Sequence, residues 1–326
     1  MTTPAAIVVS RIGGPEVLAL EPRDPGEPGP GQLRIRVAAA GVNFIDVYFR
    51  TGLYPRPVPF VAGLEGAGRI EALGEGAHHG FAVGDRVAWA SAPGSYAEAV
   101  VAPAASVVRV PDDVPDDVAA AAMLQGMTAH YLVHAIRAPE PGGWALVHAA
   151  AGGTGLLLVQ MAKNAGLNVV GTCGSAEKAA LVRDAGADAV VRYDETDFTA
   201  AAREATGGRG VDVVYDGVGR ATFDGSLASL RPRGLLALFG QASGPVPPFD
   251  LQRLNAGGSL VVTRPSLAHF VATREELEAR AGAVLGDVAA GRLRVRIGAR
   301  FPLAQAADAH RALEGRATTG KLLLIP

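Results

Sequence analysis

The sequence is poor in cysteine and in long apolar runs. One cysteine, Cys173, stands among 326 residues. That count excludes an internal disulfide framework, a zinc knuckle and a Cys-ligated iron–sulfur cluster. It fits a reducing compartment, so we expect a cytoplasmic protein. Apolar runs such as 118–124 fall far short of the roughly 18 residues that cross a membrane. The stretch 5–9 is followed by Arg11 and two glycines, so we interpret it as a strand and not as a signal peptide.

An excess of charge of one sign is also lacking. Lysine and arginine total 30 against 32 aspartates and glutamates, for a formal net charge of −2. A balanced chain without a basic block argues against a nucleic-acid partner. Lysine occurs only as Lys163, Lys178 and Lys321, so the placement of Lys178, taken up below, is informative.

Glycine is abundant, and the chain is long for one domain. Its 42 glycines and 22 prolines point to many tight turns, and the length favours two domains at roughly 150 residues each. Within 1–123, the stretches 33–37, 69–73 and 85–89 are strand-like and are separated by glycine and proline clusters. We therefore expect a β-rich domain in this part of the chain.

The pattern changes after the polar turn 112–117, which could cap a helix. From residue 144, short apolar runs alternate with amphipathic stretches such as 156–163 and 177–184. The runs are 145–149, 168–172, 189–193, 211–215, 235–239 and 260–263. Six strands that alternate with helices are typical of an α/β doubly wound parallel sheet of the Rossmann type. The last run looks like an edge strand, and because unpaired edges invite pairing we expect a homodimer.

The strongest local motif joins the first of these strands to a helix. It reads Ala149-Ala150-Ala151-Gly152-Gly153-Thr154-Gly155, with Ala150 where the usual first glycine stands. At such a turn, N–H groups of a helix N-terminus face a pyrophosphate, and positions without side chains let it approach. We predict dinucleotide binding by Ala151, Gly152, Gly153, Thr154 and Gly155. The alternative is a purely structural turn.

The end of the second strand favours NADPH over NADH. An NAD site places an acid about 20 residues after the glycines to hold the ribose 2′-hydroxyl. Here the strand ends in Cys173-Gly174-Ser175, Lys178 follows, and Tyr193 ends the next strand. A lysine and hydroxyl groups suit a 2′-phosphate. The alternative is that Lys178 is a solvated residue in the first turn of a helix, beside Glu177.

Several motifs together resemble the zinc-free quinone oxidoreductases of the medium-chain dehydrogenase/reductase superfamily. They are Gly41-Val42-Asn43-Phe44-Ile45-Asp46, Thr51-Gly52-Leu53-Tyr54-Pro55, the turn 148–155, Phe239-Gly240, Val262-Thr263-Arg264-Pro265-Ser266-Leu267 and Arg316-Ala317-Thr318. The resemblance covers essentially the whole chain. It implies a GroES-like domain over 1–123, a Rossmann NADPH-binding domain over 124–266 and a return of 267–326 to the first domain, with the active cleft between the domains.

The resemblance also makes missing metal ligands visible. Zinc alcohol dehydrogenases of this superfamily carry a cysteine where Asn43 stands and a histidine where Leu64 stands. Neither asparagine nor leucine supplies a zinc thiolate or imidazole. His130 and His134 share a helical spacing without a third ligand, and His78-His79 lies in a glycine-rich turn. We therefore expect no metal site.

The resemblance assigns roles to individual residues. Asn43, Tyr48 and Thr128 would lie near the nicotinamide, with Asn43 and Tyr48 as catalytic residues. Ser175, Lys178 and Tyr193 would bind the 2′-phosphorylated adenosine. Phe239, Gly240, Gln241 and Arg316 would also contact the cofactor. Tyr54 and Arg264 would line the quinone pocket.

These assignments have structural alternatives. Tyr48 and Tyr54 could be half-buried aromatic residues, Asn43 a turn residue, and Arg264 a residue that pins a domain junction. Gln125 stands where bacterial relatives carry a lysine, which leaves local charge and substrate preference open.

The resemblance implies metal-independent reduction of quinones by hydride transfer from NADPH. A quinone is already electrophilic, so it needs positioning more than polarisation. The first alternative is a reductase of activated double bonds in enones or alkenals, with the same cofactor site. The second, of another class, is an RNA-binding or crystallin-like structural protein, against which the balanced charge argues.

Overall fold

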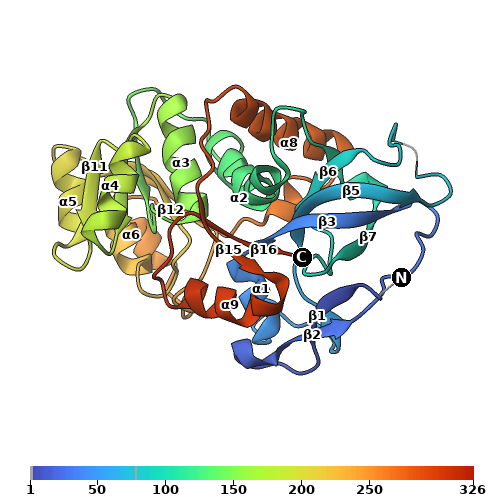
Figure 1. Ribbon diagram of the computed structural model, residues 1–326. Coiled ribbons are helices and arrows are strands. Elements are labelled where there is room, and N and C mark those ends of the chain that lie inside the picture. Colours follow the sequence, from blue (N-terminus) through green and yellow to red (C-terminus); the bar gives the residue numbers. More distant parts are fainter. Residues whose placement is uncertain (1–2, 78) are drawn as a thin grey trace. The chain divides into compact units, whose positions relative to one another are not determined.

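The computed structural model describes residues 3–77 and 79–326. The chain forms two compact units, and Figure 1 labels most of the larger helices and many of the strands. Unit 1 is Met1–Met127 with Val271–Pro326, and unit 2 is Thr128–Phe270. Within the described ranges, no helix has the length and apolar character needed to span a bilayer.

Unit 2, which the structure describes completely, is built on a parallel sheet with the strand order β11-β10-β9-β12-β13-β14. The strands are β9 (Trp144–Val147), β10 (Asn168–Cys173), β11 (Ala189–Arg192), β12 (Val211–Asp216), β13 (Leu230–Leu238) and β14 (Val261–Thr263). Each of the six predicted runs coincides with one strand, so the doubly wound parallel sheet is confirmed. The strand order reverses between β9 and β12, which is where such sheets bind ligands.

Helices cover this sheet. They are α3 (Gly153–Asn164), α4 (Ala176–Asp184), α5 (Phe198–Ala205), α6 (Phe223–Ser229) and the short α7 (Gln252–Ala256). Helix α3 packs on β9 and β10 and contacts α4, whereas α6 packs on β12 and β13 and contacts α5 (Figure 1). The central strands are apolar along their length because both faces are covered. Leu146, Val170, Val214 and Leu236 accordingly have no exposed surface.

Unit 1 is β-rich. Its larger sheet has the order β15-β16-β3-β5-β6-β8, with β7 also paired to β3, and a smaller sheet has the order β2-β1-β4. The strands are β1 (Ala5–Val9), β2 (Leu18–Pro22), β3 (Gln32–Val42), β4 (Phe60–Val61), β5 (Glu65–Leu73), β6 (Arg86–Trp89), β7 (Ala99–Pro103), β8 (Val108–Arg109), β15 (Ile297–Pro302) and β16 (Lys321–Ile325). The predicted strands at 5–9, 33–37, 69–73 and 85–89 are confirmed.

Unit 1 also contains helices. They are α1 (Phe44–Arg50), α8 (Arg274–Ala289) and α9 (Ala306–Glu314), while α2 (Asp116–His134) spans the boundary at Met127. Of these, α9 contacts β15 and β16, and α8 contacts β8. The last strand, β16, pairs antiparallel with β3, so that Leu322 lies opposite Val42 and Leu324 opposite Ala40. This pairing brings the C-terminal segment to the start of α1, about 280 residues earlier in the chain.

Candidate active site

The glycine turn of unit 2 is sterically fixed. A Cβ atom on Gly155 would lie 2.7 Å from Cα of Ala150 and closer still to the carbonyl oxygen of Ala149, so only glycine fits. Ala149 itself has a positive φ of 49°, which turns the chain from β9 into α3. Gly152 caps α3, and its lack of a side chain leaves the first N–H groups of the helix without a side-chain acceptor. The turn therefore has the shape and the donors that a pyrophosphate needs.

A buried hydrogen-bonded network supports this turn. The His148 ring lies 3.0 Å from Thr172 Oγ1 through Nδ1 and 3.0 Å from Ser226 Oγ through Nε2. Ser226 donates to Oδ2 of Asp216 at 2.9 Å, so its oxygen accepts from Nε2–H, and Nδ1 accepts from Thr172. Burial lowers the pKa of His148, in keeping with a neutral ring. The sequence motif contained His148 but gave no sign of this supporting role.

The corner after β10 gathers the residues expected at a 2′-phosphate. Ser175 caps α4, and its Oγ accepts from the backbone N–H of Lys178 at 3.3 Å. The Tyr193 backbone N–H donates to the carbonyl oxygen of Cys173 at 3.1 Å. A Cβ on Gly174 would lie 2.5 Å from the Tyr193 hydroxyl, so this hydroxyl packs against the strand end. Ser175, Lys178 and Tyr193 thus lie at the carboxyl ends of β10 and β11, and residues 173–175 include no acid.

Sequence reasoning missed Arg192 in the same corner. It lies opposite Cys173 in the β10–β11 pairing. Its guanidinium pairs with Asp194 at 2.7 Å and Glu195 at 2.6 Å. These two carboxylates compensate the charge of Arg192.

The carboxyl ends of β12 and β13 also meet at this edge of the sheet. Asp216 ends β12, and its Oδ1 accepts the backbone N–H groups of Val218 at 2.8 Å and Gly219 at 3.0 Å. Phe239 donates its backbone N–H to the carbonyl oxygen of Asp216 at 2.9 Å. A Cβ on Gly240 would lie 2.5 Å from the carbonyl oxygen of Gly217. Phe239, Gly240 and Gln241 therefore follow β13 at the edge that carries the glycine turn.

The remaining expected residues of unit 2 are spread over its helices and loops. Thr128 is buried on α2, and Arg264 is exposed directly after β14. Burial raises the pKa of Tyr131, and the charge of Arg264 opposes this increase. The Tyr131 ring stacks on that of Phe270, with the ring centroids 4.3 Å apart.

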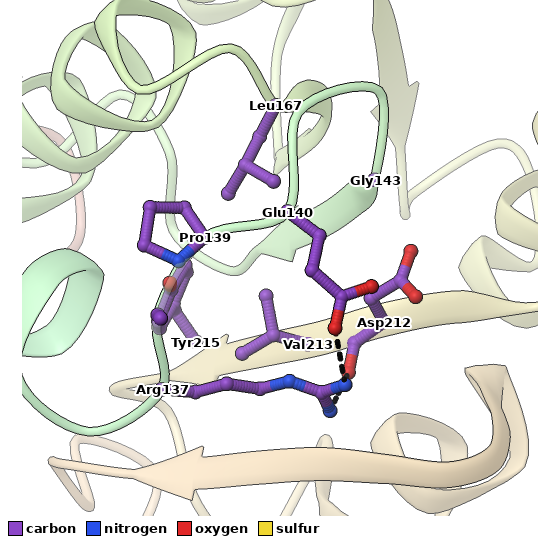
Figure 2. A pocket seen from close by; sticks show the side chains of 9 residues that line it. Arg137, Pro139, Glu140, Gly143, Leu167, Asp212, Val213 and Tyr215 are labelled. Carbon is purple, nitrogen blue, oxygen red and sulfur yellow. Dashed lines mark hydrogen bonds and ion pairs between the residues drawn. The ribbon is translucent and has the colours of Figure 1, made fainter.

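A small cavity of unit 2 lies at the opposite edge of the sheet, near the amino ends of β9 and β12. Figure 2 shows Arg137, Glu140 and Asp212 around it. Its volume of about 20 Å³ is of the size that holds one water molecule. Burial acts to raise the pKa of Asp212, but hydrogen bonds from Arg209, the Trp144 backbone and Arg231 outweigh it and lower this pKa to about 2. The cavity belongs to a structural ion cluster and not to the glycine turn.

In unit 1, Asn43 caps α1 and is buried, with 3% of its surface exposed. Its amide nitrogen donates to Oε2 of Glu65 at 2.8 Å and to the carbonyl oxygen of Gly41 at 3.2 Å. Its Oδ1 accepts from Lys321 at 2.7 Å and from Gln125 at 3.5 Å. Both donor hydrogens and both acceptor positions of the amide are therefore used within unit 1.

Glu65 and Lys321 form the buried ion pair behind Asn43. Their side chains have 0% and 1% exposure. The other oxygen of Glu65 accepts the backbone N–H of Leu124 at 2.5 Å. Lys321 begins β16, so its position follows from the pairing of β16 with β3. Sequence reasoning missed Lys321, and the only signal that could have pointed to it was the scarcity of lysine, which gave no indication of its partner.

The structure brings Tyr48 and Tyr54 together. Their ring centroids are 5.2 Å apart at an edge-on angle of 61°, and the Tyr54 backbone N–H donates to the carbonyl oxygen of Tyr48 at 3.0 Å. Arg316 is exposed after α9, with a positive φ of 56°.

The described residues of the chain contain no group of three or more His, Cys, Asp or Glu side chains arranged to hold a metal ion. Asn43 is engaged as described above, and Leu64 is half-buried. The rings of His130 and His134 lie 4.8 Å apart. His78, named above with His79, lies outside the described residues.

Three features define a dinucleotide-binding oxidoreductase unit: a parallel sheet with this strand order, a glycine-rich turn after its first strand, and a second strand that ends without an acid. Models of two families match the chain: the alcohol dehydrogenase GroES-like domain over residues 29–112 and the zinc-binding dehydrogenase over residues 153–280.

Individual proteins are similar over the full length. A quinone oxidoreductase from Pseudomonas aeruginosa is 45% identical over 98% of this chain and 99% of its own. A 2-haloacrylate reductase from a Burkholderia species is 42% identical over 98% of each chain. A mycobacterial protein solved in complex with NADPH is 52% identical, with a TM-score of 0.96 over 99% of this chain and 100% of that one. The chain belongs to the quinone oxidoreductase family of the medium-chain dehydrogenase/reductase superfamily.

Proposed function

We propose that this protein reduces quinones by hydride transfer from NADPH, without a metal ion. The observation that carries this proposal is the corner after β10, where Ser175 caps α4, Lys178 lies in the first turn of that helix, the Tyr193 hydroxyl packs against Gly174, and residues 173–175 include no acid. Full-length similarity to a quinone oxidoreductase supports the substrate class.

Residues of unit 2 would hold the cofactor. The N–H groups of Gly153, Thr154 and Gly155 at the start of α3 bind the pyrophosphate, and the turn residues Ala151 and Gly152 let it approach. Ser175, Lys178 and Tyr193 bind the 2′-phosphate. Thr128 would lie near the nicotinamide, and Phe239, Gly240 and Gln241 would also contact the cofactor. For Arg316, a cofactor contact stays a prediction from the family resemblance. When bound, NADPH supplies the hydride.

Residues of unit 1 would position the quinone. Tyr48 and Tyr54 present an edge-on aromatic pair, with a hydroxyl on each ring, that suits a flat aromatic acceptor. The quinone takes up the hydride and one solvent proton to become the hydroquinone. Because every polar side-chain atom of Asn43 is engaged within unit 1, we propose that Asn43 acts by holding α1 and thereby Tyr48. Arg264 would complete the quinone pocket.

The proposal that no metal ion is needed rests on the side chains that stand at the zinc-ligand positions of related enzymes. Asn43 and Leu64 stand where a zinc enzyme of this superfamily needs a thiolate and an imidazole, and Lys321 places an ammonium group 2.7 Å from Asn43 Oδ1. A cation so close disfavours the binding of a second one. We also propose a cytoplasmic location, where the single buried thiol of Cys173 stays reduced.

The experiment is a panel of acceptors with NADPH consumption as the readout and a metal assay on the same sample. We expect 1,4-benzoquinone and 9,10-phenanthrenequinone to be reduced fastest, by protein that contains no stoichiometric zinc. The second candidate function, reduction of activated double bonds, is favoured by the similarity to a 2-haloacrylate reductase. Faster turnover of 2-alkenals or 2-haloacrylates than of both quinones would replace the first proposal by the second.

A further inference from the structure

A second buried carboxyl lies at the start of α1. Asp46 is the third residue of this helix, and 4% of its surface is exposed. Its Oδ2 accepts the backbone N–H of Asn43 at 2.9 Å and the hydroxyl of Tyr96 at 2.9 Å. Its Oδ1 is buried without a hydrogen-bond partner among the residues that the structure describes. A carboxylate in this position would leave one charged oxygen desolvated and uncompensated.

Of the cations around Asp46, Lys321 and Arg50 are hydrogen-bonded to other groups, whereas Arg56 acts on Asp46 through its charge only. Lys321, from β16, contacts Glu65 of β5 and Asn43. Arg50, from the last turn of α1, binds Glu314 of α9 through both of its terminal nitrogens, at 2.8 and 2.9 Å. Arg56 has its guanidinium 4.5 Å from the ring centroid of Phe60. The cluster therefore contains two buried carboxyl groups, those of Asp46 and Glu65, but a single buried ammonium group, which contacts Glu65.

The groups beyond Asp46 form a directional chain. Arg50 donates to Nδ1 of His310 at 3.1 Å, so the ring proton sits on Nε2, 3.2 Å from the Tyr96 hydroxyl. Tyr96 in turn donates to Asp46. Burial lowers the pKa of His310 to about 3, and burial raises that of Tyr96, so both groups are neutral near pH 7. The chain stabilises Oδ2 of Asp46 with neutral donors only.

We propose that Asp46 is a neutral carboxylic acid in the working enzyme and serves as a positioning residue, whose ionisation slows quinone reduction. This role rests on the proposed function. Hydride uptake places negative charge on the quinone oxygen, and a carboxylate at Asp46, in the first turn of the helix that carries Tyr48, would oppose that charge. As a neutral acid, Asp46 still accepts the hydrogen bond at the start of α1 but adds no negative charge that would oppose the charge on the quinone oxygen.

The direction of the pH effect follows from the surroundings. Burial raises the pKa of Asp46 to about 7, against the lowering effects of the Tyr96 and Asn43 hydrogen bonds and of Lys321, and Glu65 adds to the increase. Activity per enzyme is therefore expected to fall as the pH rises through the neutral range. We expect ionisation to lower the rate by about tenfold, which corresponds to about 1.4 kcal/mol in the activation free energy.

The test compares kcat/KM for a quinone from acid to alkaline pH in the wild type and in Asp46→Asn. The amide keeps an oxygen for Asn43 and Tyr96 but cannot ionise, so we expect a flat profile across the range in which the wild type loses about tenfold. Tyr96→Phe removes a hydrogen bond that favours the ionised form, so its fall should move to higher pH. Asp197→Asn, at the exposed N-cap of α5, is the matched control and should keep the wild-type profile.

Infrared spectroscopy supplies a readout that does not depend on turnover. The wild type at pH 6 should show the C=O stretch of a protonated carboxyl that Asp46→Asn lacks and that disappears on alkaline titration. Absence of that band, or an unchanged activity profile in Asp46→Asn, overturns the proposal. Failure of the wild type to reduce any quinone overturns the proposed function and with it the positioning role. The infrared titration decides separately whether Asp46 holds the proton.

Discussion

The ammonium group of Lys321 donates a hydrogen bond of 2.7 Å to Oδ1 of Asn43. This contact joins the first residue of the last strand to the N-cap of α1, across 278 residues of sequence. It also fixes the amide orientation of Asn43, because the oxygen must face the ammonium and the nitrogen must face Glu65 and Gly41. The C-terminal strand β16 thus holds the start of α1, and α1 is the helix that carries Tyr48.

Replacing this lysine should destabilise the protein. Lys321→Met leaves the carboxylate of Glu65 buried without a counter-charge, which costs about 3–5 kcal/mol of unfolding free energy. Urea denaturation measures the loss. The double variant Lys321→Met/Glu65→Gln removes both charges at similar volume and should recover most of it. Equal losses in the single and double variants would show that the ion pair is not the source.

Gly155 should not tolerate a side chain. In Gly155→Ala the new methyl group would clash with the backbone at Ala149 and Ala150, so we expect NADPH affinity to fall at least about tenfold, with a lower melting temperature. Fluorescence titration and thermal unfolding measure the two effects. Gly282→Ala is the matched control, because its Cβ would meet nothing within 4 Å on α8. That change should raise stability by about 0.5–1 kcal/mol.

Lys178 should decide between the two nicotinamide cofactors. Loss of a charge-assisted contact to phosphate costs about 1.5–3 kcal/mol, so Lys178→Ala should raise the KM for NADPH roughly ten- to a hundredfold and leave the KM for NADH nearly unchanged. Lys163→Ala is the control, since Lys163 pairs with Asp188 at 2.8 Å. An equal response of both cofactors to Lys178→Ala would show that the 2′-phosphate assignment is wrong.

His310 should weaken the folded state in acid. Burial lowers its pKa from 6.5 to about 3, so the folded state keeps the ring neutral while the unfolded chain takes up a proton below pH 6.5. The stability that the neutral His310 ring contributes to the folded state is fully present above pH 6.5 and is lost as the pH falls towards 3. At pH 5 the loss is about 2 kcal/mol. His310→Gln keeps polar atoms near Arg50 and Tyr96 but cannot titrate.

Urea midpoints at pH 7.5 and pH 5 test this effect. The loss of stability between the two values should be smaller in His310→Gln than in the wild type. Asp46 contributes with the opposite sign over pH 4–7, because its raised pKa makes the folded state the better proton binder there. For that reason the difference between variant and wild type is the quantity to compare.

The exposed edge of unit 2 should mediate self-association. Strand β14 is an edge strand, and Val261 on it is 48% exposed. If the protein is a homodimer through this edge, Val261→Lys should shift its mass towards the monomer in light scattering, because a charge on an edge strand blocks pairing. Leu251→Lys, at a 69% exposed position outside any strand, should not.

The sequence by itself determined the architecture of unit 2. The six apolar runs, the turn at 149–155 and the non-acidic end at Cys173-Gly174-Ser175 are local patterns. The apolar composition of each run and the sterics of the turn depend on residues that are close in the sequence, and this is why the runs coincide with β9 to β14.

Only the tertiary structure decided what surrounds α1. Glu65 and Lys321 are 256 residues apart, and their meeting depends on the register in which β16 pairs with β3. That register also uses up the polar atoms of Asn43 and places the ammonium group of Lys321 on Glu65 and Asn43 rather than on Asp46. No local pattern encodes these facts, because the free energy of a buried charge depends on long-range partners that the fold brings together.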